Sequence, residues 1–130
     1  MKTILVDAVD AFVINVNGTY KVFKAMYDLL ESFPNRKILL TSANDEGFKK
    51  YDLDKVPYVV FTLKHDPEKT NPQYYEILLR HLNLGRNDVI YFEHNPDAVK
   101  SAEKVGITSY YYDSEKADLR MLKKFLSDNL

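Results

Sequence analysis

Five short apolar runs, separated by segments with helical periodicity, constrain the fold of this chain more than any other feature. The runs are Thr3–Val6, Ile38–Leu40, Tyr58–Leu63, Val89–Phe92 and Ser109–Tyr112. They are nearly continuous rather than alternating with polar residues, which is typical of strands covered on both faces. Strands that alternate with helices indicate a parallel sheet with right-handed crossovers. We therefore expect an α/β, three-layer Rossmann-like fold, with a central, mostly parallel five-stranded sheet and helices on both faces.

Helix signals lie between and after these runs. The predicted helices are Tyr20–Phe33, a segment that starts at Asn71-Pro72, Pro96–Val105 and a C-terminal helix with Leu119, Leu122 and Leu126 on its apolar face. Asn71 is a typical helix cap, and Pro72 suits the first helical position. Gly106 is a typical residue to end a helix. We expect a further short helix and loop over residues 44–54.

One segment breaks the alternation of strand and helix. Residues 12–18 come soon after the first run and end in Asn17-Gly18, a strong signal for a hairpin turn. We expect a short extended flap beside the first strand. The flap would lie close to Asp7.

Length and composition indicate one soluble globular domain, residues 1–130. Apolar residues make up 45% of the chain and charged residues 28%, which argues against disorder. The absence of cysteine excludes disulfides, thiolate metal sites and a cysteine nucleophile, and it suits a reducing cytoplasm, where we expect the protein.

Two classes of partner are disfavoured by the charge and apolar patterns. The net charge is −1 with no basic stripe, so we expect no nucleic-acid binding. The first apolar run is too short for a signal peptide, and no run approaches the roughly 18 residues of a membrane span. The flap and the ten tyrosines suit a homodimer surface as well as ordinary packing.

Polar residues stand where apolar strands end. Asp7, Thr41 and Glu93 each follow a run, and Lys69 precedes a predicted helix. The carboxyl ends of parallel strands face one crevice, and ligands of open α/β sheets bind there. An acid, a hydroxyl, a cation and a second acid at that crevice indicate a site for a phosphoryl group and a divalent metal.

The order of these residues resembles the four motifs of the haloacid dehalogenase (HAD) superfamily. Val6-Asp7 is similar to its nucleophile motif, and Ile38–Ser42 to its second motif, a strand ending in Thr or Ser. The segment 69–75, Lys-Thr-Asn-Pro-Gln-Tyr-Tyr, looks like the third motif. The segment 89–107 looks like the fourth, in which a strand ends in an acidic pair. The resemblance covers nearly the whole chain and implies a small HAD-like fold without a cap domain.

The resemblance implies a mechanism and a set of site residues. Asp7 would attack a phosphoryl group and form an aspartyl-phosphate. Thr41, with Ser42, would bind the phosphate, and Lys69 would neutralise charge on the nucleophile and the transferring group. Asp7 and Glu93 would hold Mg²⁺, which takes oxygen ligands.

This sequence departs from the superfamily's pattern at two places. The general acid of HAD phosphatases lies two positions after the nucleophile, where this chain has Val9, and the next acid is Asp10. Asp10 would serve as the catalytic acid only if the chain bulges or coils there, because a one-residue shift turns an extended side chain to the other face. The acidic pair of the fourth motif is Glu93-His94, and histidine is a poor ligand for Mg²⁺.

Several alternative assignments stay open from the sequence. Ala8 and Asp10 would be the nucleophile-motif pair in a shifted alignment, which would abolish the chemistry. Lys64 is a possible substitute for Lys69. Asp97 would either join the metal site or cap the following helix.

Three functions are compatible with this site. The leading one is a Mg²⁺-dependent HAD-like phosphohydrolase that acts on a phosphorylated substrate, and the open site suits a macromolecular one. The second is a catalytically inactive HAD-fold protein that works by binding a partner, because the second aspartate is missing. The third is a receiver-like phosphoacceptor, which the lack of an aspartate at the end of Tyr58–Leu63 disfavours.

Overall fold

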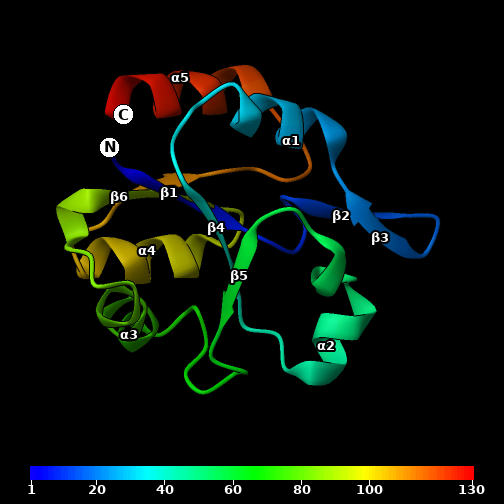
Figure 1. Ribbon diagram of the computed structural model, residues 1–130, viewed down its shortest axis with the longest axis horizontal. Coiled ribbons are helices and arrows are strands. Elements are labelled where there is room, and N and C mark those ends of the chain that lie inside the picture. The colour runs from blue at the N-terminus through cyan, green and yellow to red at the C-terminus, as the bar shows by residue number, and fades with distance from the viewer.

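The central sheet of the protein has five parallel strands (Figure 1). We describe a computed structural model that covers residues 1–130. The strands, in their order across the sheet, are β5 (Val59–Thr62), β4 (Lys37–Thr41), β1 (Thr3–Asp7), β6 (Val89–Glu93) and β7 (Thr108–Tyr111). Each lies within a residue or two of its predicted bounds, and the expected α/β fold class is confirmed.

Helices cover both faces of this sheet. One face carries α1 (Lys24–Glu31) and α5 (Leu119–Asn129), and the other carries α3 (Pro72–Leu82) and α4 (Pro96–Lys104) (Figure 1). The short helix α2 (Asp45–Lys50) and the 3₁₀ turns η1 (Leu53–Lys55) and η2 (Arg86–Asp88) lie in the connections. No helix is long and apolar enough to cross a membrane.

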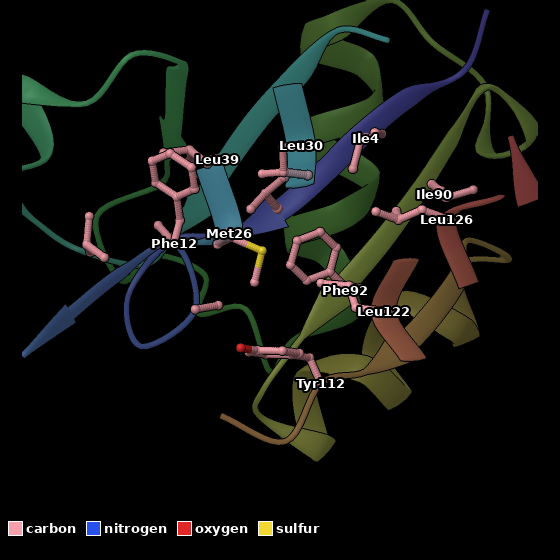
Figure 2. Packing of buried hydrophobic residues seen from close by; sticks show 14 of the residues in the cluster. Ile4, Phe12, Met26, Leu30, Leu39, Ile90, Phe92, Tyr112, Leu122 and Leu126 are labelled. Carbon is pink, nitrogen blue, oxygen red and sulfur yellow. The ribbon is translucent and has the colours of Figure 1, made fainter. Parts of the chain in front are cut away.

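Alternation along each strand divides the core into two clusters. Ile4 packs toward α1 and α5 with Met26 and Leu30 (Figure 2). Val6 belongs to the same cluster. Leu5, between them, packs on the opposite face with residues of α3 and α4. Successive side chains of a strand point to opposite faces, so strands with two covered faces must be apolar throughout.

The flap is a two-stranded hairpin, as the sequence predicted. Strand β2 (Val13–Val16) pairs antiparallel with β3 (Thr19–Val22). The two turn residues, Asn17 and Gly18, have φ angles of +54° and +86°, the left-handed backbone that a two-residue hairpin turn requires.

The prediction of a helix over Tyr20–Phe33 is wrong at its start. Helix α1 begins at Lys24, because Tyr20 and Val22 belong to β3 and pair with Asn15 and Val13 of β2. The other predicted helices are confirmed, with Asn71 Oδ1 accepting a 3.0 Å hydrogen bond from Gln73 N–H at the start of α3. The short helix and loop expected over residues 44–54 are α2 and η1.

The strand order fixes where a ligand can bind. Counted along the chain, the five sheet strands are arranged 3-2-1-4-5, so the direction of winding reverses between β1 and β6. Ligands of open α/β sheets bind at the carboxyl ends of the strands at this switch point. Asp7 ends β1 and Glu93 ends β6. A receiver-like fold would need the order 2-1-3-4-5, which this sheet does not have.

Candidate active site

A cavity of about 240 Å³ opens at the carboxyl ends of the strands. It is lined by Asp7, Val9, Thr41, Ser42, Ala43, Gly47, Tyr51, His65, Lys69 and His94. Three of the four polar residues that the sequence placed at this edge are therefore in its wall. The fourth, Glu93, is fully buried behind them.

Lys69 joins the two buried carboxylates. Its Nζ lies 2.8 Å from Oδ1 of Asp7 and 2.6 Å from Oε1 of Glu93. Both carboxylate side chains are wholly buried, and the lysine side chain is 14% exposed. Buried charges are tolerated only when they are paired and hydrogen-bonded. The ammonium group is therefore what allows two acids to lie side by side here.

His94 occupies the other side of Asp7. Its backbone N–H donates to Asp7 Oδ2 at 3.1 Å, and its ring Nδ1 is hydrogen-bonded to the same oxygen. The ring Nδ1 also lies 3.3 Å from Glu93 Oε2. With Lys69 on one oxygen and His94 on the other, both oxygens of Asp7 are engaged.

Glu93 is held by its own strand and by the turn that follows. Tyr91 OH donates to Glu93 Oε1, and Asn95 N–H donates to Oε2 at 2.9 Å. Tyr75 OH lies 3.4 Å from Tyr91 OH and extends the network under the sheet face that α3 covers. No buried polar side-chain atom of the protein lacks a partner.

The environment separates the acidities of the two carboxyls. Burial, and then repulsion from Glu93, raises the pKa of Asp7 against the pull of Lys69 and His94. Burial opposes ionisation of Glu93 most strongly, but the Lys69 ammonium and the hydrogen bonds with His94, Asp7 and Lys69 together outweigh it and lower the pKa of Glu93. Hydrogen bonds to Asp7 and Glu93 raise the pKa of His94 to about 10. The site thus holds a cluster of two acids and two basic groups, formed by Asp7, Glu93, Lys69 and His94.

Strand β4 and the residue that follows it supply the hydroxyl groups of the site, those of Thr41 and Ser42. Thr41 Oγ1 accepts from Ala43 N–H at 3.1 Å, which leaves its own hydroxyl hydrogen for a ligand in the cavity. Ser42 Oγ accepts from Lys69 N–H at 3.0 Å and so anchors the loop that carries the lysine. Tyr74 OH donates to Thr41 O at 2.8 Å from the start of α3.

The chain coils after Asp7, as a role for Asp10 would require. Asp10 has a φ of +70°, and Phe12 and Val13 N–H both donate to Ala8 O. The carboxyl of Asp10 nevertheless lies outside the cavity wall, half exposed, with Oδ2 3.9 Å from His94 Nε2. Val9 takes the place in the wall that an acid two positions after Asp7 would have.

The remaining candidates lie away from the cluster. Lys64 pairs with Asp45 at 3.1 Å and makes no contact with Asp7, so it does not replace Lys69. Asp97 is exposed in the first turn of α4, where Asn95 rather than Asp97 is the cap. His65 lies in the cavity wall and bonds Glu68.

Two contributors to the site were missed from the sequence. The role of Tyr91 had a signal, because it precedes Glu93 by two residues and therefore points to the same sheet face. His94 was considered only as a poor metal ligand. Its contact with Asp7 depends on the loop after β6, for which the sequence offers no comparable signal.

Comparisons with known proteins support the fold. No protein-family model matches the chain, and no curated protein matches it in sequence. Among solved structures, a HAD family enzyme from Bacteroides thetaiotaomicron, solved as an alanine mutant with magnesium and inorganic phosphate, is similar with a TM-score of 0.74. It is 10% identical, and the match covers 93% of this chain and 98% of that one.

Two further structures agree. The phosphatase domain of a Bacteroides fragilis protein, complexed with Mg, has a TM-score of 0.61 at 16% identity, covering 94% of this chain and 39% of that one. A candidate beta-phosphoglucomutase from Thermotoga maritima has a TM-score of 0.58 at 14% identity, with 85% of each chain covered. The chain therefore has the HAD fold, and the resemblance seen in the sequence is confirmed at the level of the fold.

Proposed function

We propose that this HAD-fold chain is a phosphohydrolase that passes the phosphoryl group through an aspartyl-phosphate on Asp7. The observation that carries the proposal is the ion pair at the floor of the cavity, where Lys69 Nζ lies 2.8 Å from the Asp7 carboxylate. A cation in this position favours the ionised form of the buried acid against the effect of its burial, and it can also neutralise the charge of a phosphoryl group. Thr41 and Ser42 lie in the same wall.

The chemistry would take place in two steps. An oxygen of Asp7 forms a bond to phosphorus while the ester P–O bond breaks, and the electron pair of that bond leaves with the ester oxygen. Lys69 and the Thr41 hydroxyl would hold the non-bridging oxygens during this transfer. Water then attacks the aspartyl-phosphate, and phosphate departs with the regeneration of the Asp7 carboxylate.

The donor set fits Mg²⁺. One ligand atom each from Asp7, Glu93 and His94 lies within 4.8 Å of the others. The two carboxylates supply the oxygen donors that Mg²⁺ prefers, so Asp7 and Glu93 would hold the ion. A bound Mg²⁺ would neutralise charge on the transferring phosphoryl group. The magnesium in two of the similar structures supports this assignment.

Val9 limits which esters such a site can cleave. No carboxyl besides Asp7 lines the cavity, so the leaving oxygen has no acid beside it there. The leaving groups of aryl and acyl phosphates depart without prior protonation, whereas an acid speeds the cleavage of alkyl phosphates by about 10²–10⁴-fold. We therefore propose substrates with good leaving groups. The open cavity, without a cap domain, suits a phosphate displayed on a larger molecule.

The same observation favours a second candidate function. With Val9 in the wall and both Asp7 oxygens engaged, the domain would bind a phosphorylated partner without turning it over. Lys69 and Thr41 would still supply the anion site.

Hydrolysis of p-nitrophenyl phosphate, with and without Mg²⁺, tests the proposal. We expect slow turnover that Asp7→Asn abolishes and that Asp97→Asn, an exposed acid outside the cluster, leaves unchanged. Beryllofluoride binding, followed by NMR, separates the two candidates. Binding without turnover supports the binding protein, and the absence of both overturns the phosphate site.

A further inference from the structure

His94 lies at the corner formed by the two carboxylate oxygens that Lys69 does not contact. Lys69 binds Oδ1 of Asp7 and Oε1 of Glu93. The other oxygen of each carboxylate, Asp7 Oδ2 and Glu93 Oε2, faces His94 Nδ1. These two oxygens are the ones that remain for a metal ion. The imidazole therefore stands where Asp7 and Glu93 would bind Mg²⁺.

We propose that His94 and Mg²⁺ are alternative occupants of this corner, so that the imidazole must leave Asp7 before the metal binds. The proposal rests on the metal role given above to Asp7 and Glu93. It assigns His94 a function outside the chemistry: it covers the nucleophile and weakens metal binding in the resting protein.

Coordination chemistry makes the two occupants exclusive. A ring nitrogen that donates its hydrogen to Asp7 Oδ2 has no lone pair for a metal. Mg²⁺ demands oxygen ligands at about 2.1 Å in octahedral geometry, and imidazole is a poor substitute. Space for the ion on Asp7 Oδ2 therefore appears only when the ring moves away.

Burial favours the histidine in the resting state. Asp7 is wholly buried although it lies in the cavity wall, because Lys69 and His94 cover its two oxygens. A metal ion can reach the two carboxylates only after this cover has moved.

The ring also has a place to go. The His94 side chain is 31% exposed, and its far nitrogen, Nε2, lies 3.9 Å from Oδ2 of Asp10 at the surface. A rotation outward would exchange the buried partner Asp7 for the exposed partner Asp10. This gives Asp10 a role that does not require it to reach the cavity.

Calorimetric Mg²⁺ titration of the full chain without substrate tests the exclusion. In the wild type, Mg²⁺ must first displace the charge-assisted hydrogen bond between His94 and Asp7. His94→Asn lacks this bond and should therefore bind Mg²⁺ about tenfold or more tightly than wild type. The matched control is His65→Asn, which alters another histidine of the same wall that does not contact Asp7. Because this variant loses only an exposed contact with Glu68, we expect its Mg²⁺ affinity to stay within about twofold of wild type. Equal affinities of His94→Asn and wild type would overturn the proposal.

A second measurement needs no variant and covers the case in which His94→Asn does not fold. The ring ¹H and ¹⁵N NMR signals of His94 in the wild type should shift as Mg²⁺ saturates the site, and those of His81 should not. Unchanged His94 signals at Mg²⁺ saturation would overturn the proposal that His94 and Mg²⁺ exclude each other. A failure of both wild type and His94→Asn to bind Mg²⁺ would overturn it too. Neither measurement needs turnover, so p-nitrophenyl phosphate hydrolysis with and without Mg²⁺ reports separately on the proposed function.

Discussion

The ammonium group of Lys69 lies 2.8 Å from the Asp7 carboxylate, across 62 positions of the sequence. The acid ends the central strand of the sheet, and the lysine lies in the loop before α3. The carboxylate is wholly buried, so this contact links the stability of the fold to the presence of the site.

Replacing Lys69 by Met should destabilise the protein by about 3–5 kcal/mol, because two buried carboxylates lose their cation. Urea unfolding at neutral pH measures this loss. The control is Lys64→Met in the same loop, whose ion pair with Asp45 is exposed and should be worth less than about 1 kcal/mol. Similar losses in the two variants would contradict the role of Lys69.

Replacing Tyr91 by Phe should destabilise the protein by about 1–3 kcal/mol, because Glu93 Oε1 loses a buried hydrogen-bond donor. Thermal unfolding measures the change. Tyr111→Phe, an exposed tyrosine of the neighbouring strand, is the matched control and should be close to neutral. A neutral Tyr91→Phe would mean that the hydroxyl contributes nothing to holding Glu93.

The sequence predicted the site where strand geometry determines it. Asp7, Thr41 and Glu93 converge because parallel strands end at one edge of the sheet, and the loop before α3 brings Lys69 to the same edge. The start of α1 was mispredicted because apolar residues at 20 and 22 suit a helical stripe as well as a strand. Pairing with β2 decided in favour of the strand.

Loop conformation, in contrast, could not be read from the residues. The chain coils at Asp10, but the direction of the Asp10 side chain depends on the left-handed backbone at that residue. The contact of His94 with Asp7 depends likewise on the turn between β6 and α4. Such contacts are long-range, and neither propensity nor periodicity encodes them.

The contribution of His94 to stability should disappear at high pH. Its pKa is raised to about 10 in the folded protein, against an ordinary value of about 6.5. A raised pKa means that folding favours the protonated ring, so the stabilisation is complete below the ordinary pKa and is lost as the pH rises through the folded one. The partial exposure of the ring reduces the expected gain to about 2 kcal/mol.

Urea unfolding of wild type and His94→Gln from about pH 6 to pH 10.5 checks this expectation. The difference in unfolding free energy should be largest at the acidic end and should shrink across the range. A difference that stays constant with pH would contradict protonation of the ring in the folded state.

Replacing Val9 by Asp should raise activity toward alkyl phosphates, because it places an acid in the cavity wall two positions after the nucleophile. General acid catalysis is worth about 10²–10⁴-fold for a leaving group that must be protonated. Aryl phosphates, whose leaving groups depart as anions, should gain little. The measurement is kcat/KM for an alkyl and an aryl phosphate, in Val9→Asp and in Val9→Asn as the uncharged control. An equal gain for the two substrates, or a gain in Val9→Asn, would show that the substitution acts through binding rather than through proton transfer.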